Sequence, residues 1–284
     1  MSRKREPRQW SWPNGEQIAF SVGIAFEGFD LISQYAHGPR GSAPDAFSLS
    51  FADYGSRAGI WRLLDLLDEF DIKANVSASG KAAVDHPQVV RAVADAGHEV
   101  NAHGWVNDAA RPSDPPGEHE EIERCTAAIL ASAGVRPVGW TGPGSISTPE
   151  TLRLLVEAGY IWSGDAASDD LPYPVETPAG PIMVLPRTNI FHNDLIMWLG
   201  PLNSPAVLWD GFRDTFDELY AEGTNGHPKW TEITLHAHIA GRPTAVPTIR
   251  RCLEYVREHD GVWCAPRRDI ARWAAQREDV SLPA

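Results

Sequence analysis

Residues 18–30, IAFSVGIAFEGFD, decide the fold class of this 284-residue chain. The first nine residues of this stretch are almost all apolar or small and rich in β-formers, which predicts a strand buried on both of its faces. Such strands belong to parallel sheets whose connections are helices. Glu27 follows the strand directly, at the end where parallel sheets gather their functional groups.

The rest of the chain alternates between strand and helix patterns. Further strands are expected at 72–77, 99–102, 137–140, 181–186, 232–235 and 261–263. Helices are expected at 54–70, 86–96, 117–134, 148–158, 207–222 and 247–259, with one more at the C-terminus and a long irregular loop at 31–49. About seven strand–helix units result, equal to or one short of a closed α/β barrel. We therefore expect one domain over 1–284, with residues 1–12 as a flexible tail.

The composition narrows the class of function. The net charge of −13 argues against nucleic acid and anionic membranes as partners, because both require a basic surface. The chain contains no apolar run of membrane-spanning length and no signal peptide, and its three cysteines lack disulfide or CxxC spacing. These features predict a cytoplasmic protein with reduced thiols. Phosphate-binding GxxxxGK[ST] and GxGxxG motifs and the GxSxG nucleophile motif are absent.

Four of the predicted strands end in polar side chains. The segments concerned are 27–30, 103–108, 140–141 and 236–238. In a parallel barrel the carboxyl ends of the strands share one mouth, so these segments are expected to converge there.

The residues in these segments allow more than one interpretation. His103 is a candidate metal ligand or general acid–base, and the alternative is a histidine hydrogen-bonded at a strand end. Glu27 is a candidate base or cation ligand, or else a carboxylate that caps a turn. His236 and His238 alternate, so an extended strand would put both on one face; alternatively, one packs in the core and one is exposed. Trp105 and Trp140 are candidate walls of an apolar pocket.

The motifs and their order resemble the NodB-homology polysaccharide deacetylases, and more narrowly their cytoplasmic branch, which includes metal-independent allantoinases and peptidoglycan-deacetylase-like enzymes. The resemblance covers nearly the whole chain. It rests on segments 12–15, 54–61, 86–87, 96–104, 136–140, 169–173, 193–194, 235–236 and 241–243.

This resemblance implies a distorted (β/α) barrel of about seven strands that hydrolyses an amide-type C–N bond. It also implies that His103 and His236 match the family's histidines, and that Glu27 stands near the family's Asp pair. Three positions depart from the family pattern: Gly28 replaces the second carboxylate, Asn107 the second histidine, and Thr141 an arginine. These departures put a standard zinc site in doubt.

We expect hydrolysis of a small cyclic amide, imide or ureide, with Glu27, His103 and His236 as catalytic residues. The residues expected to bind the substrate are Arg57, Trp105, Trp140, Thr141, Asn193 and His238. The cofactor is either absent or one divalent metal such as zinc, held by Glu27, His103 and Asn107 with Asp30 or Asp108 assisting. The alternatives are a metal-dependent N-deacetylase of an amino sugar or sugar conjugate, and a non-catalytic pseudoenzyme of the same fold. The resemblance also implies a homodimer or homotetramer.

Overall fold

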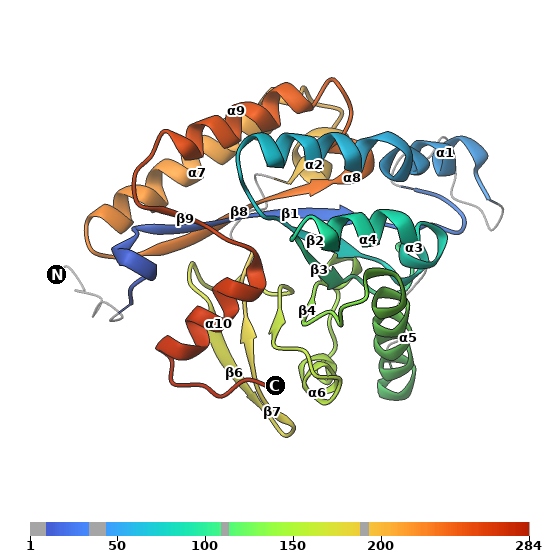
Figure 1. Cartoon of the computed structure of the whole chain (residues 1–284), viewed down its shortest axis with the longest axis horizontal. Coiled ribbons are helices and arrows are strands. Elements are labelled where there is room, and N and C mark those ends of the chain that lie inside the picture. The colour runs from blue at the N-terminus through green and yellow to red at the C-terminus, as the bar shows by residue number, and fades with distance from the viewer. Residues whose placement is uncertain (1–9, 34–43, 109–113, 188–192, 284) are drawn as a thin grey trace.

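A computed structural model describes residues 10–33, 44–108, 114–187 and 193–283. Its strands form one curled, mostly parallel half-barrel with helices outside, in the order β6-β7-β5-β4-β3-β2-β1-β8, and β9 also pairs with β1. Helices α7 and α9 lie along the β1–β8 side, whereas α6 and α10 lie at the β6–β7 end (Figure 1). This arrangement confirms the expected barrel-like α/β fold.

The strands are β1 (Ile18–Phe26), β2 (Asn75–Ala78), β3 (Glu99–Ala102), β4 (Gly139–Trp140), β5 (Trp162–Ser163), β6 (Tyr173–Thr177), β7 (Gly180–Val184), β8 (Lys229–His236) and β9 (Val262–Cys264). The helices are α1 (Ala46–Tyr54), α2 (Ile60–Glu69), α3 (Gly80–Asp85), α4 (Pro87–Asp95), α5 (Pro115–Ala133), α6 (Thr151–Glu157), α7 (Ala206–Thr224), α8 (Ala237–Ala240), α9 (Val246–Arg257) and α10 (Arg267–Arg277).

Strand β1 is the centre of the sheet, as its composition predicts. All nine of its residues are buried, because β2 and β8 cover its edges and helices cover its outer face. Its pairing with β8 sets Ala25 opposite His236, and its pairing with β2 sets Phe26 opposite Ala78. These registers bring the ends of several strands level with Glu27.

The structure corrects the expected number of strands. The described residues contain nine strands rather than about seven, because β5 and β6 were not predicted. Strand β5 has two residues, too few to show a periodic pattern. Strand β6 pairs antiparallel with β7 as a hairpin, where the sequence predicted a parallel unit. Helix α1 also begins inside the expected loop 31–49, of which residues 34–43 lie outside the described part.

The prediction that residues 1–12 form a flexible tail is wrong for residues 10–12, whereas residues 1–9 lie outside the described part of the chain. Trp10 and Trp12 are 8% and 1% exposed. The Trp12 indole donates to the carbonyl of Lys229 at 2.7 Å and its ring lies 5.7 Å from that of Trp263. The two indoles therefore pack into the second hydrophobic cluster of the domain instead of extending into solvent.

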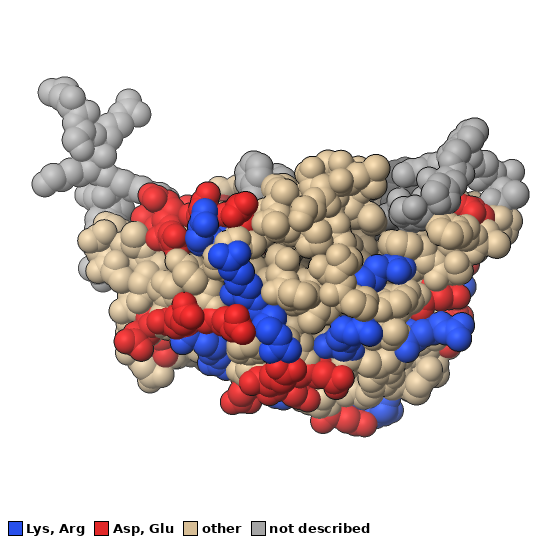
Figure 2. Space-filling model, turned by 90° about the horizontal axis from the view of Figure 1, so that it is seen from above, with Lys and Arg blue, Asp and Glu red and all other residues tan. Residues whose placement is uncertain are grey.

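Acidic and basic side chains are interspersed with uncharged surface on the face shown in Figure 2. Within the described residues, every helix is too short or too polar to cross a bilayer.

Helix α8 packs tightly against the π-helical turn η2 (Gly55–Gly59), which links α1 to α2. A Cβ placed on Gly59 would lie 2.0 Å from the carbonyl oxygen of Ala237. We expect Gly59→Ala to lower the free energy of unfolding by about 3 kcal/mol, because the clash is with backbone that cannot rotate away. Urea denaturation measures this loss.

The control for this substitution is Gly226→Ala. At Gly226 no atom lies within 4 Å of an added Cβ, but φ is +89°, so the change reports backbone strain alone, about 1 kcal/mol. Equal losses in the two variants would show that the contact between η2 and α8 is not tight.

Candidate functional site

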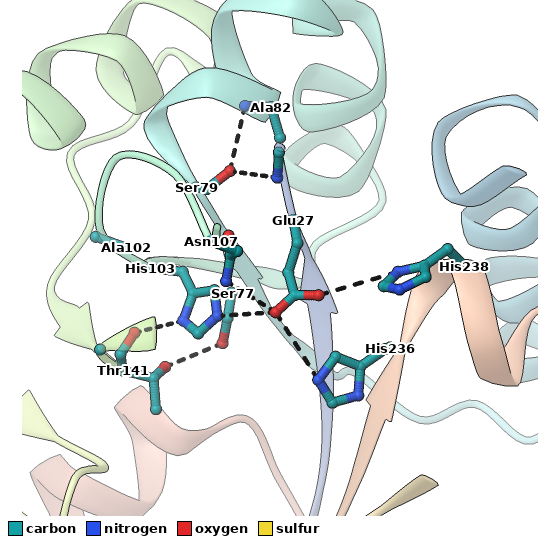
Figure 3. A network of polar contacts seen from close by, with 12 residues as sticks. Glu27, Ser77, Ser79, Ala82, Ala102, His103, Asn107, Thr141, His236 and His238 are labelled. Carbon is teal, nitrogen blue, oxygen red and sulfur yellow. Dashed lines mark hydrogen bonds and ion pairs between the residues drawn. The ribbon is translucent and has the colours of Figure 1, made fainter. Parts of the chain in front are cut away.

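Glu27 stands directly after β1, at the carboxyl end of the sheet. Its side chain is 5% exposed, and it is surrounded by His103, His236 and His238 (Figure 3). Burial alone would raise the pKa of Glu27, but the charge of His236 and the hydrogen bond of His103 outweigh it and lower the pKa to about 2. The site therefore contains a buried carboxylate that is ionised at neutral pH.

His103 approaches Glu27 from the end of β3. The pairing of Ala102 with Trp140 puts His103 beside Thr141, whose carbonyl oxygen accepts a hydrogen bond from His103 Nδ1 at 2.5 Å. Since a carbonyl can only accept, Nδ1 carries a proton. The other nitrogen, Nε2, points at Glu27 Oε1, 3.5 Å away. His103 is thus held in one orientation by backbone, with its reactive nitrogen facing the carboxylate.

His236 is the last residue of β8 and is held by Asp194. Oδ1 of Asp194 lies 2.6 Å from His236 Nδ1, and Oδ2 accepts the His236 backbone N–H at 2.8 Å. Burial would lower the pKa of His236, but the charges of Asp194 and Glu27 raise it to about 9. The imidazole is therefore protonated at neutral pH, with Nε2 3.9 Å from Glu27 Oε1.

His238 reaches Glu27 by a different route from the predicted one. The chain leaves β8 at His236 and enters α8, so the two histidines do not share a strand face. His238 Nδ1 lies 4.0 Å from Glu27 Oε2, the other carboxylate oxygen, and its ring packs edge-on against Phe29 and Phe51. Both histidines are buried, and burial lowers the pKa of His238 to about 4.

Asn107 completes the surroundings of Glu27. Its Nδ2 donates to Glu27 Oε1 at 2.8 Å. An amide that presents N–H groups has no lone pair for a metal, so Asn107 acts as a hydrogen-bond donor here.

Glu27, His103 and Asn107 lie together, but the other two predicted zinc ligands, Asp30 and Asp108, do not join them. Asp108 accepts the backbone N–H groups of Asp30 and Ile32, and Asp30 pairs with Lys81 at 3.1 Å. Among the described residues no three His, Cys, Asp or Glu side chains are placed to hold a metal ion. The donor set expected for zinc therefore does not fit this arrangement, and Asp30 and Asp108 are structural residues of the loop.

Gly28 has no room for the second carboxylate of the family pattern. Its N–H donates to Ser79 Oγ at 2.8 Å, and Ser79 also caps α3. A Cβ at residue 28 would lie 2.9 Å from both the Ala82 nitrogen and the Lys81 Cβ. Glycine is thus required by the packing of α3 on this turn.

A cavity of about 310 Å³ opens beside Glu27 Oε1. His103, Asn107 and His236 line it near Glu27, and Ser77, Arg187, Asn193, Ile196 and Arg267 line other parts of it. His238 instead lines a cavity of about 50 Å³ that also contacts Glu27. Glu27 therefore separates the two cavities, and His238 is not placed to bind a substrate in the larger one.

Three predicted substrate-binding residues have other roles. Trp105 packs under the guanidinium of Arg124, 3.4 Å from its ring centroid. Trp140 is fully buried and packs on Tyr160 in the core. Thr141 Oγ1 accepts a hydrogen bond from Asn101 Nδ2 at 2.7 Å. The two tryptophans follow or end their strands with their rings turned away from the cavity, and Thr141 supports His103 through its carbonyl.

Two further residues, Asn193 and Arg57, were expected to bind the substrate, and the structure places only one of them at the cavity. Asn193 lines the cavity, as expected, and its Oδ1 also accepts the Leu195 N–H at 3.0 Å. Arg57 is exposed on η2 and lines neither cavity beside Glu27. The structure therefore gives no geometric support to substrate binding by Arg57.

Two residues of the site were missed from the sequence. Asp194 stands next to the predicted Asn193, and Arg187 lies three residues beyond Val184, the last residue of β7. Arg187 nevertheless lies beyond the carboxyl end of its strand, on the side of the sheet where polar groups gather.

The arrangement can perform general acid–base chemistry. A carboxylate and an imidazolium of opposite charge face the same small cavity, with a third orientated imidazole beside them. The carboxylate can remove a proton from water, and the imidazolium can stabilise an oxyanion and give a proton to a leaving group.

Comparison with known proteins adds independent information. A sequence model described as polysaccharide deacetylase matches residues 41–162. A Schizosaccharomyces pombe protein provisionally named a polysaccharide deacetylase is 30% identical, with 93% of this chain and 92% of that protein aligned. A Helicobacter pylori peptidoglycan deacetylase is 21% identical over 89% of this chain and 94% of its own length.

Solved structures agree with these matches. A probable polysaccharide deacetylase from Pseudomonas aeruginosa PAO1 is 32% identical with a TM-score of 0.85, covering 95% of each chain. The Puue allantoinase is 33% identical with the same TM-score, covering 95% of this chain and 94% of its own.

Proposed function

Because the chain belongs to the polysaccharide deacetylase family, a class of C–N hydrolases, we propose that it opens the ring of a small cyclic amide, imide or ureide. The observation that carries this proposal is the pairing of ionised Glu27 with protonated His236 across a cavity of about 310 Å³. This volume is at the lower end of small-molecule sites, whereas a polymer needs an open groove. The likeness to an allantoinase over 95% of the chain also supports a cyclic ureide as substrate.

The proposed reaction uses groups of this chain alone. Glu27 accepts a proton from water, whose oxygen adds to the ring carbonyl carbon. His236, orientated by Asp194, stabilises the oxyanion and then gives its proton to the ring nitrogen as the C–N bond breaks. His103 and Asn107 hold the Glu27 carboxylate in place, since both contact Oε1.

A substrate panel tests this proposal. We expect hydrolysis of at least one of hydantoin, dihydrouracil, succinimide and allantoin, and no deacetylation of N-acetylglucosamine, measured by chromatography of the products. We also expect the rate to be unchanged by chelator or added zinc, because the ligand set does not fit a metal.

Two outcomes would favour the two alternative functions, an amino-sugar deacetylase and a non-catalytic binding protein. Near-stoichiometric zinc in the purified protein, together with chelator-sensitive release of acetate, would favour an amino-sugar deacetylase. Absence of turnover for every compound, while one of them raises the melting temperature, would favour a binding protein of the same fold.

A further inference from the structure

The larger cavity is electrostatically unlike the rest of the molecule. The chain carries a net charge of −13, yet among the described residues lining this cavity Glu27 is the one acidic side chain. Two arginines and two histidines line it as well. The cavity therefore has an excess of cationic groups, which favours an anionic ligand or product.

Arg267 does not account for this excess. Its guanidinium forms a buried ion pair with Glu232, and the two side chains are 3% and 0% exposed. The charge of Arg267 is thus compensated inside the barrel by a carboxylate of β8.

Arg187 has no such partner. Its Nε donates to the carbonyl of Gly164 at 3.1 Å and its backbone N–H to that of Ala166 at 2.6 Å, and it forms no ion pair with a described carboxylate. The carboxylate whose charge acts on the Arg187 guanidinium is that of Asp165. Its two oxygens accept the Gly142 N–H at 2.8 and 3.0 Å. The Arg187 guanidinium is therefore anchored by backbone at Nε, and its charge is only partly balanced by Asp165, with which it forms no direct ion pair.

Arg187 lies in the same cavity as His236, the proposed acid of the reaction. Its charge acts on His236, the imidazole that faces the developing oxyanion in the proposed mechanism. Arg187 and His236 therefore line the same cavity and are close enough for their charges to interact.

Ring opening creates a charge at this point. Water adds across the C–N bond: the nitrogen leaves with a proton, and the carbonyl carbon keeps the water oxygen as a carboxylic acid, which releases its proton. The nitrogen, as an amine, amide or ureido group according to the ring opened, and the carboxylate remain in one molecule, and the new carboxylate lies near ionised Glu27, which repels it. Resting on the proposed ring-opening function, we propose that Arg187 binds this product carboxylate, and that the physiological product is an open-chain carboxylate such as an N-carbamoyl amino acid.

The test measures binding without turnover. N-carbamoylglycine, the product of hydantoin, and its neutral analogue N-carbamoylglycinamide are titrated by calorimetry into wild type, Arg187→Met and Arg187→Lys. We expect wild type to prefer the carboxylate at least tenfold, Arg187→Met to bind both compounds alike, and Arg187→Lys to fall between them, because lysine keeps the charge but not the planar fork. Arg213→Met, at an exposed arginine of α7, should keep the wild-type preference.

Several results would overturn the assignment. These are an equal affinity of wild type for the two compounds, no binding of either, or a carboxylate preference that survives in folded Arg187→Met. The wild-type comparison decides the matter even if the methionine variant does not fold. A preference that depends on Arg187 without any ring opening would leave the anion site standing and contradict the proposed function, whereas ring opening without the preference would contradict the anion site alone.

Discussion

Replacing Glu27 by Gln is expected to lower kcat by about 10³-fold while the protein remains folded. The carboxylate is ionised and faces the cavity, so the amide removes the base without changing the volume of the side chain. Asn107 can still donate to the remaining carbonyl oxygen of the glutamine, which limits the loss of stability. Steady-state kinetics on the substrate identified by the panel, together with a thermal melt, measures both effects.

The matched control is Glu176→Gln, the same change at an exposed carboxylate of β6. This variant should retain wild-type kcat and melting temperature. A Glu27→Gln protein with more than a tenth of the wild-type kcat would exclude Glu27 as the general base.

Asp194→Asn should move the pH dependence of the reaction. In the wild type His236 is the protonated group, so kcat/KM is expected to be high below its pKa of about 9 and to fall as the pH rises through it. The asparagine removes the Asp194 charge, the largest contribution that raises this pKa, whereas burial, which lowers it, and the charge of Glu27, which raises it, both remain. The basic limb should therefore move to lower pH, and kcat/KM at pH 8 should fall by about tenfold if the limb moves to about 7.

The profile of kcat/KM from pH 5 to 10 checks this shift, and the direction of the shift separates it from simple damage to the site. A variant with lower activity but an unmoved limb at pH 9 would mean that another group sets the limb. Asp210→Asn, at an exposed carboxylate of α7, is the control and should leave the profile unchanged.

The strand-end argument recovered the centre of the site because it depends on a property that one sequence shows. Glu27, His103 and His236 each follow or end a strand whose apolar composition is visible, and parallel pairing then forces them together. Resemblance to a family added the same residues independently. The fold could be predicted in outline for the same reason, although the short strand β5 left no pattern to read.

Side-chain direction could not be predicted. Trp105 and Trp140 have the right positions along the chain, but the Trp140 ring packs on Tyr160 in the core and the half-buried Trp105 ring packs under Arg124. His238 illustrates the same limit, since a change from strand to helix after His236 redirects it to the other side of Glu27. The position of Arg187 beyond the end of β7 is visible in the sequence, but the turn of its side chain into the cavity is not.

The tight packing of α3 on Gly28 limits how this enzyme could be redesigned. Protein engineers who wish to install a metal-dependent deacetylase site would need a second acidic side chain at that turn, and the backbone of Ala82 and the side chain of Lys81 occupy the space. Exchanging individual residues around Glu27 therefore cannot rebuild such a site; the first turn of a neighbouring helix would have to be moved first. Turning this candidate site into a metal-dependent one would therefore require a change of backbone as well as a change of side chains.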